Sequence, residues 1–230
     1  MAALFMVGIF VALLLTDILV RKYQTKKEEA TLEIPVGKET ALPFNLNYEN
    51  LALPGGLFFH KGHTWAKLDV SGNVQVGMDD FAQKVIGKID EIKLRKVGDT
   101  VFRGEKFFTI KQGKRQAIFT SPVDGVIESA NKEVSSDPAA LKNDPYEKGW
   151  IYSVKPTNLN DNIKFLSVAE EAKTWLKNEV QRFKEFIAEQ FVNDKMIGKS
   201  LADGGVPVDG VMEHMDDFSW MKLQDEFLTK

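Results

Sequence analysis

The sequence predicts a mainly β protein with an N-terminal transmembrane helix and a C-terminal amphipathic helix. An apolar run opens the chain, short segments rich in Val, Ile, Phe and Thr alternate with glycine turns in its middle, and a helical spacing of apolar residues follows. Short, evenly spaced strands are typical of a β-sandwich or a flattened barrel. The predicted parts are an anchor (1–20), a flexible linker (21–56), a β domain (57–159), an amphipathic helix (160–192) and a turn-rich tail (193–230).

Residues 1–20 predict an uncleaved membrane helix. Met1 to Leu15 contains no charged side chain, and twenty helical residues span roughly 30 Å, the thickness of a bilayer core. A signal peptide is disfavoured because neither a positively charged start nor a small-residue cleavage site is present. Lys and Arg flank the span only on its far side, beginning with Arg21 and Lys22. The positive-inside rule therefore predicts a single-pass protein of the inner (cytoplasmic) membrane whose domain faces the cytoplasm.

The linker and the β domain are predicted from residues that interrupt regular secondary structure and from turn sequences. Charged residues, prolines and the closing Pro54-Gly55-Gly56 make residues 21–56 a flexible linker. In the β domain, Ser71-Gly72-Asn73 and Gln112-Gly113-Lys114 predict hairpin turns. One short helix is expected over residues 79–86, with an acidic N-cap.

The helix and the tail each leave an alternative open. The helical stripe predicts either packing on the β domain or docking of a partner helix. The tail brings four apolar residues close together in sequence, and they cover either their own domain or another subunit. The stripe consists of Ala169, Ala172, Leu176, Val180, Phe183, Ile187 and Phe191, and the tail residues are Phe218, Met221, Leu223 and Phe227.

Composition narrows the possible functions. A net charge of −3 argues against nucleic-acid binding, and the absence of cysteine excludes disulfides and thiolate chemistry. The three histidines, His60, His63 and His214, show no metal-ligand spacing, so we predict no metal site. His63 is expected in a strand beside Trp65 and is interpreted as structural. No catalytic set of residues is recognisable, which favours a carrier or a scaffold over an enzyme.

Six motifs in order resemble the H protein of the glycine cleavage system, over most of Leu57 to Leu159. They are His63-Thr64-Trp65, VGMDDFAQ at 76–83, IGKI at 86–89, VGDTVFRGE at 97–105, SPVDGV at 121–126, and Asn131 with DPYEKGW at 144–150. The resemblance implies a lipoyl-domain-type flattened β-barrel. It also implies partner enzymes between which a lipoyl arm carries an acyl group, an aminomethyl group or electrons.

The resemblance assigns the carrier lysine to Lys114. The family places its lipoyl-lysine seven residues before the serine that corresponds to Ser121, and that count reaches Lys114. Where the family reads Glu-Ser-Val-Lys-Ala, this chain has Lys111-Gln112-Gly113-Lys114-Arg115. The lysine is kept, but Lys111 and Arg115 replace an acidic and a neutral neighbour, so an attaching enzyme that reads an acid meets the opposite charge.

Two hypotheses follow for the function. In the first, the protein is a membrane-tethered lipoyl carrier with lipoate on Lys114, bound to the lipid bilayer through residues 1–20 and serving partner enzymes there. In the second, the fold has lost lipoate and acts as a scaffold or an accessory subunit of a membrane complex. The seven-residue spacing between Lys114 and Ser121, which matches the family, favours the first hypothesis. The basic neighbours of Lys114 favour the second.

Overall fold

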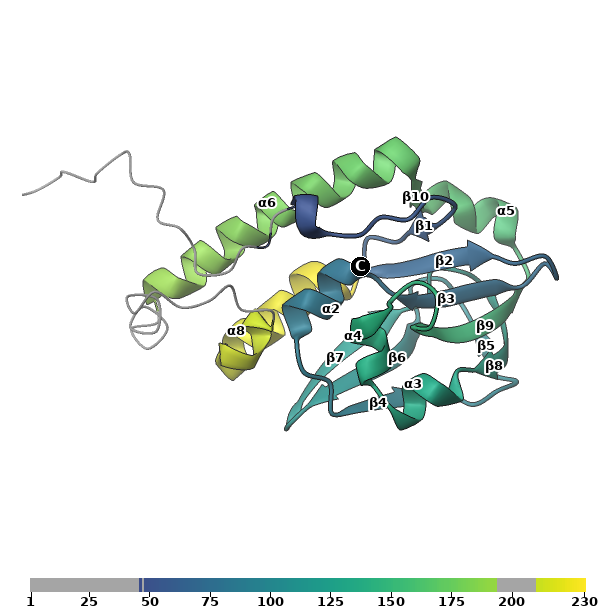
Figure 1. Ribbon diagram of the computed structural model, residues 1–230, viewed down its shortest axis with the longest axis horizontal. Helices are drawn as coiled ribbons and strands as arrows, with labels where there is room; N and C mark the ends of the chain where they lie inside the picture. The colour runs from purple at the N-terminus through teal and green to yellow at the C-terminus, as the bar shows by residue number, and fades with distance from the viewer. Residues whose placement is uncertain (1–45, 47, 194–209) are drawn as a thin grey trace, which may run out of the picture. The chain divides into compact units, whose positions relative to one another are not determined.

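The computed structural model describes residues 46, 48–193 and 210–230 (Figure 1). The strands are β1 (Phe58–Phe59), β2 (Thr64–Leu68), β3 (Val74–Met78), β4 (Glu91–Leu94), β5 (Thr100–Val101), β6 (Lys106–Gln112), β7 (Arg115–Thr120), β8 (Gly125–Ala130), β9 (Trp150–Pro156) and β10 (Ser167–Val168). The α-helices are α2 (Asp80–Ile86), α3 (Lys132–Ser136), α4 (Ala139–Asn143), α5 (Leu159–Asn162), α6 (Ala169–Asn193) and α8 (Asp217–Leu223). Short 3-10 turns are η1 (Tyr48–Asn50), η2 (Ile163–Phe165) and η3 (Val211–His214), and η4 (Gln224–Leu228) is a π-helical turn.

The strands form two antiparallel sheets, as expected for a mainly β sandwich. The larger sheet has the order β10-β1-β2-β3-β9-β8-β5, and the smaller one has the order β4-β6-β7. Buried and exposed positions alternate along β7 and at the start of β3, so each strand turns one row of side chains inward. Both predicted hairpins are present, with Asp69–Asn73 joining β2 to β3 and Gly113-Lys114 joining β6 to β7.

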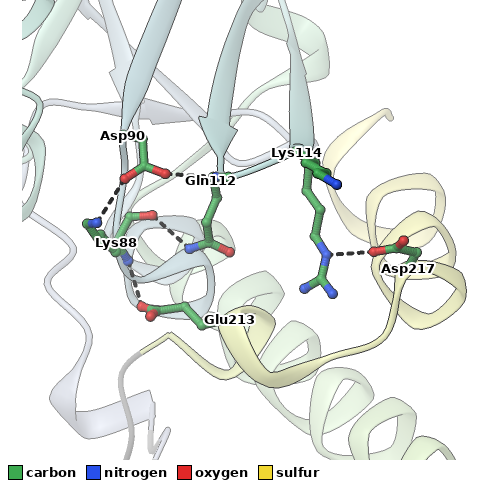
Figure 2. A pocket seen from close by; sticks show the side chains of 8 residues that line it. Lys88, Asp90, Gln112, Lys114, Glu213 and Asp217 are labelled. Carbon is green, nitrogen blue, oxygen red and sulfur yellow. Dashed lines mark hydrogen bonds and ion pairs between the residues drawn. The ribbon is translucent and has the colours of Figure 1, made fainter.

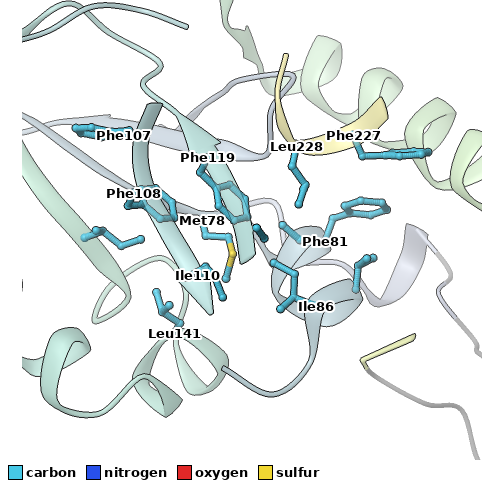
Figure 3. Close-up of a cluster of buried hydrophobic side chains, with 14 of the residues drawn as sticks. Met78, Phe81, Ile86, Phe107, Phe108, Ile110, Phe119, Leu141, Phe227 and Leu228 are labelled. Atoms are coloured by element: carbon cyan, nitrogen blue, oxygen red, sulfur yellow. The ribbon is translucent and has the colours of Figure 1, made fainter. Parts of the chain in front are cut away.

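The core lies between the sheets and extends under the helices (Figure 3). Aromatic side chains fill much of it, and the rings of Phe108 and Phe119 stack 4.8 Å apart across β6 and β7. Met78 and Ile110 are fully buried in the same cluster. Burial of large apolar side chains of this kind contributes roughly 1.5–3 kcal/mol each, so the cluster is the main source of stability.

Helix α2 begins where the sequence predicted an acidic cap. The Asp79 carboxylate accepts a hydrogen bond from Ala82 N at 2.9 Å, and this bond satisfies one of the free amides of the first turn. Asp79 is itself buried, because it also faces His63. The residue is therefore both a helix cap and part of a polar contact inside the core.

Helix α6 packs on its own domain, and this resolves the first alternative. Leu176, Val180, Phe183 and Ile187 are buried in the main core cluster. The helix starts at Ala169, later than residue 160, because β10 first pairs with β1 and Ala169 then takes a φ of +50°. Ala169 itself is exposed. The larger sheet therefore includes residues beyond position 159.

The C-terminal segment, residues 210–230, also packs on this domain. Trp220 Nε1 donates to Gln116 O at 3.1 Å, and Ile118 N donates to Gln224 Oε1 at 3.3 Å, so α8 and η4 lie against β7. Of the two outcomes left open for the tail, residues 210–230 cover their own domain, although its four apolar residues do not share one face, because successive helical residues turn by about 100°. Leu223 and Phe227 are buried, whereas Phe218 and Met221 are 72% and 64% exposed on the opposite face.

The end of the expected linker is fixed to the domain. Ala52 N donates to Asp80 Oδ2 at 2.9 Å, and the Tyr146 hydroxyl donates to Ala52 O at 2.7 Å. Leu51 is buried beside them. The predicted anchor, residues 1–20, lies outside the described residues. Within the described part of the chain, no helix is both long enough and apolar enough to cross a membrane.

Candidate functional site

The site predicted from sequence lies on the hairpin of β6 and β7, called here the carrier hairpin. Gln112 pairs with Arg115, so only Gly113 and Lys114 make the turn. Gly113 has a φ of +58°, which glycine adopts without steric cost and which a two-residue turn requires at its first central position. The sequence Gly-Lys is therefore a compact tip that brings Lys114 to the end of two paired strands.

The tip is held by hydrogen bonds to the segment that follows α2 (Figure 2). Gln112 Nε2 donates to Ile86 O at 2.8 Å and to Lys88 O at 2.7 Å. Gly113 N donates to Asp90 Oδ2 at 2.7 Å, and this bond lowers the pKa of the Asp90 carboxyl. Both residues before Lys114 are thus fixed from outside the hairpin, which gives the lysine a firm support.

Lys114 is exposed at this tip. Among the described residues its ammonium makes no hydrogen bond or ion pair, whereas its neighbours Lys111 and Arg115 are both paired. An exposed, unengaged primary amine on a rigid turn is the arrangement required for amide formation with a carboxylic acid, because the attaching enzyme must reach the amine. The residues present therefore fit a lipoyl group on Lys114.

The two basic neighbours of Lys114 are neutralised, which sequence reasoning did not predict. Lys111 pairs with Glu91, the residue directly opposite on β4, and that hydrogen bond raises the pKa of Lys111. Arg115 Nε donates to Asp217 Oδ1 at 2.8 Å, and Arg115 Nη1 donates to Met212 O at 3.2 Å. The expected excess of positive charge around Lys114 is therefore offset by carboxylates from β4 and α8.

An open pocket of about 440 Å³ lies beside the tip (Figure 2). Besides the hairpin residues Lys114 and Arg115, its charged lining comes from two sides: Lys88 and Asp90 follow α2, while Glu213 and Asp217 belong to the C-terminal segment. Glu213 Oε1 accepts a hydrogen bond from Lys88 N at 2.7 Å and ties the two sides together. No local pattern could have placed Glu213 or Asp217 here, because each lies about a hundred residues from its partner along the chain.

His63 lies apart from this site, in a buried cluster. Its Nδ1 lies 2.8 Å from Asp79 Oδ2, its Nε2 lies 3.5 Å from Glu179 Oε1, and its ring stacks on Phe81 with centroids 4.3 Å apart. His63 has no exposed surface, so no substrate can reach it. The structural role predicted for this histidine agrees with its burial between the sheet and α6.

Comparisons with known proteins match the same part of the chain. A family model described as "Glycine cleavage H-protein" matches residues 57–179, more than half of the 230 residues. The chain is 37% identical over 123 residues to the probable glycine cleavage system H protein of Pyrococcus abyssi, across 54% of this chain and 91% of that protein. It is 32% identical over 151 residues to the probable glycine cleavage system H protein 2 of Sulfolobus acidocaldarius, across 64% and 96% respectively.

A solved structure also matches this region. It is the crystal structure of a glycine cleavage system H protein from Mycobacterium marinum, with a TM-score of 0.46 and 28% identity, covering 55% of this chain and 98% of that one. The family match at residues 57–179 includes the sheets, α2 and the carrier hairpin. By its sequence over residues 57–179, the chain belongs to the glycine cleavage H-protein family.

Proposed function

We propose that this protein is a membrane-tethered lipoyl carrier with lipoate joined through an amide to Lys114 Nζ. The observation that carries the proposal is the exposed Lys114 ammonium at the tip of the carrier hairpin, which has no partner among the described residues. The count of seven residues back from Ser121, taken from the resemblance, supports it. Family membership supports the carrier role, and it supports enzymes of glycine cleavage as the class of partner.

The residues around Lys114 suit that role in two ways. Gln112 and Gly113 are fixed by hydrogen bonds, so the base of a long arm stays in place while its far end moves. Lys114 is exposed, so replacing its ammonium by a neutral amide breaks no ion pair within the described part of the chain and buries no charge. Lipoate, when attached, supplies a dithiolane ring able to carry an acyl group, an aminomethyl group or a pair of electrons.

The basic neighbours do not argue against attachment once their partners are counted. Glu91 lies against Lys111, and Asp217 lies against Arg115. An enzyme that approaches the tip therefore meets a surface where positive and negative side chains alternate, rather than a purely basic one. The family has a glutamate at the position of Lys111. In this chain the carboxylates of Glu91 on β4 and Asp217 on α8 lie beside the hairpin instead.

Mass spectrometry of protein from its native host tests the attachment directly. We expect the peptide that contains Lys114 to carry the mass of one lipoyl group, because its amine is accessible and correctly placed. The peptide that contains Lys88, an exposed lysine of the same pocket, is the matched control and should be unmodified. A Lys114 peptide of unmodified mass, from cells that lipoylate other proteins, would refute the carrier proposal.

We infer further that residues 1–20 anchor the protein in the cytoplasmic membrane, with the domain on the cytoplasmic side. The support is the uncharged run at Met1–Leu15 and the positive charges that follow it. The full chain should stay in the membrane fraction through a high-salt wash, and a variant lacking residues 1–20 should become soluble. Release of the full chain by salt alone would contradict anchoring, because a spanning helix leaves the bilayer only with detergent.

A scaffold without lipoate is the second candidate. It is favoured by one observation: Arg115, next to Lys114, binds Asp217 and Met212 O and so helps to hold the C-terminal segment against the hairpin. This segment lies outside the family match at residues 57–179. If the protein is such a scaffold, Lys114 remains unmodified in the host, and substitution of Lys114 leaves the host phenotype unchanged.

A further inference from the structure

A second pocket, of about 310 Å³, is lined by residues that directly follow β1 and by residues of and beside β10. Residues from four separate stretches of the chain line it, and most of its charged side chains are positive. The charged lining residues are Lys61, Arg103, Lys164, Glu171 and Lys230, and His60, Phe165, Leu166 and Ser167 complete it.

The deepest polar group of this pocket is His60. Its side chain is only 5% exposed, and its Nδ1 accepts a hydrogen bond from Gly62 N at 3.1 Å. Since Nδ1 acts as the acceptor, the neutral ring carries its proton on Nε2. No described residue accepts a hydrogen bond from that N–H. A ring N–H that lines a pocket and has no partner among the described residues can donate to an acceptor oxygen of a ligand.

The charge around His60 is consistent with an acceptor that is negative. Burial, together with the positive charges of Arg103, His63 and Lys61, lowers the pKa of His60 to about 4. The ring is therefore neutral at pH 7, and the cations around it produce a positive potential at its N–H. A neutral N–H in a positive field is a favourable donor to an oxyanion.

Arg103 also lines this pocket, and its guanidinium lies over the ring of Phe165, with Cζ 3.7 Å from the ring centroid. Among the described residues neither Arg103 nor Lys61 makes a side-chain ion pair, whereas Lys164 is paired with Asp161 at 2.7 Å. Two free cations and one neutral donor match the charge and the three acceptor oxygens of a phosphate group. Glu171, the one acidic side chain in the lining, faces the same space.

We propose that the pocket lined by His60, Lys61 and Arg103 binds the phosphate group of a small soluble molecule. The proposed phosphate site includes neither Lys114 nor lipoate. Phosphate binding can therefore be disproved without affecting the carrier proposal. His60, Lys61 and Arg103 lie within the family-matched residues 57–179, whereas Lys230 of the lining lies outside them. The site adds a second binding function to the domain.

Titration of the full chain in mild detergent with inorganic phosphate tests the proposal. The sequence contains three histidines, so the ring nitrogen signals are few in a two-dimensional NMR spectrum, and a His60→Gln variant identifies those of His60. At constant ionic strength, phosphate should shift the His60 signals in a saturable way and raise the pKa of His60. The exposed His214, outside the pocket, should not respond.

Variants determine whether the cations act as proposed. Arg103→Gln and Lys61→Gln together should weaken phosphate binding by about tenfold or more, because charge-assisted hydrogen bonds are lost. The matched control is Lys132→Gln on α3, an exposed lysine outside the pocket, which should leave the affinity unchanged. Shifts that never saturate, equal saturation by acetate, or an unchanged affinity in the double variant would each overturn the proposal.

Discussion

Replacing Lys114 with arginine is expected to abolish the lipoyl mass increment completely while leaving the domain folded. Arginine keeps the positive charge and the length of the side chain, but its guanidinium does not form the amide that a primary amine forms. The Lys114 side chain is exposed and forms no hydrogen bond or ion pair with any described residue, so the free energy of unfolding should change by no more than about 0.5 kcal/mol. Intact mass and urea denaturation measure the two effects.

The matched control for this substitution is Lys88→Arg. Lys88 lies in the same pocket and is also exposed, but it is ion-paired with Asp90 and is not at the tip. This variant should keep the full mass increment. A Lys114→Arg protein that still carries lipoate would show that another lysine is the attachment point, and loss of lipoate in both variants would mean that the pocket, rather than the lysine, is what the attaching enzyme requires.

The parts of the site that sequence alone could predict are those fixed by local chemistry. Gln112-Gly113-Lys114 predicts a tight turn because glycine accepts a positive φ, and the turn is present at those residues. Glu91, Glu213 and Asp217 could not be predicted in the same way. They reach the hairpin through the pairing of β4 with β6 and through the packing of the C-terminal segment, which are long-range consequences of the fold.

The fold was predictable for a similar reason. Short strands and turns repeat locally, so the mainly β architecture and the capped helix α2 followed from the pattern. The packing of α6 and of residues 210–230 depends on the surface that their apolar faces contact. The sequence alone left open whether that surface belongs to the same domain or to a partner. The expectation that the chain carries a group without an active site of its own is confirmed by its family.

A pH-dependent loss of stability above neutrality is the second large effect that we expect. Asp79 and Glu179 lie on either side of His63, and all three side chains are buried. Burial by itself would lower the pKa of His63, but the two carboxylates outweigh burial and raise that pKa to about 9. The folded protein therefore keeps this imidazole protonated at pH values where an unfolded chain, with a histidine pKa near 6.5, has released the proton.

The direction of the effect follows from proton linkage. Below about pH 6.5 both the folded and the unfolded states bind the proton, so the contribution of His63 to stability is present in full. Between about 6.5 and 9 only the folded state retains it, and the free energy of unfolding should fall by roughly 1.4 kcal/mol per pH unit, or roughly 3 kcal/mol across the window. Tyrosines ionise only near pH 10 in unfolded chains, so they do not obscure this interval.

A His63→Gln variant isolates the contribution of this cluster. Glutamine cannot take up the proton, so Asp79 and Glu179 lose their positive partner, although Arg182 still pairs with Glu179. Near pH 6.5 the variant should be less stable by roughly 3 kcal/mol, the usual cost of removing one member of a buried ion pair. Above pH 9 the two proteins should converge, because the wild-type imidazole is then neutral as well. Urea denaturation at a series of pH values measures both curves, and parallel curves would show that the proton on His63 does not contribute to holding α6 against the sheet.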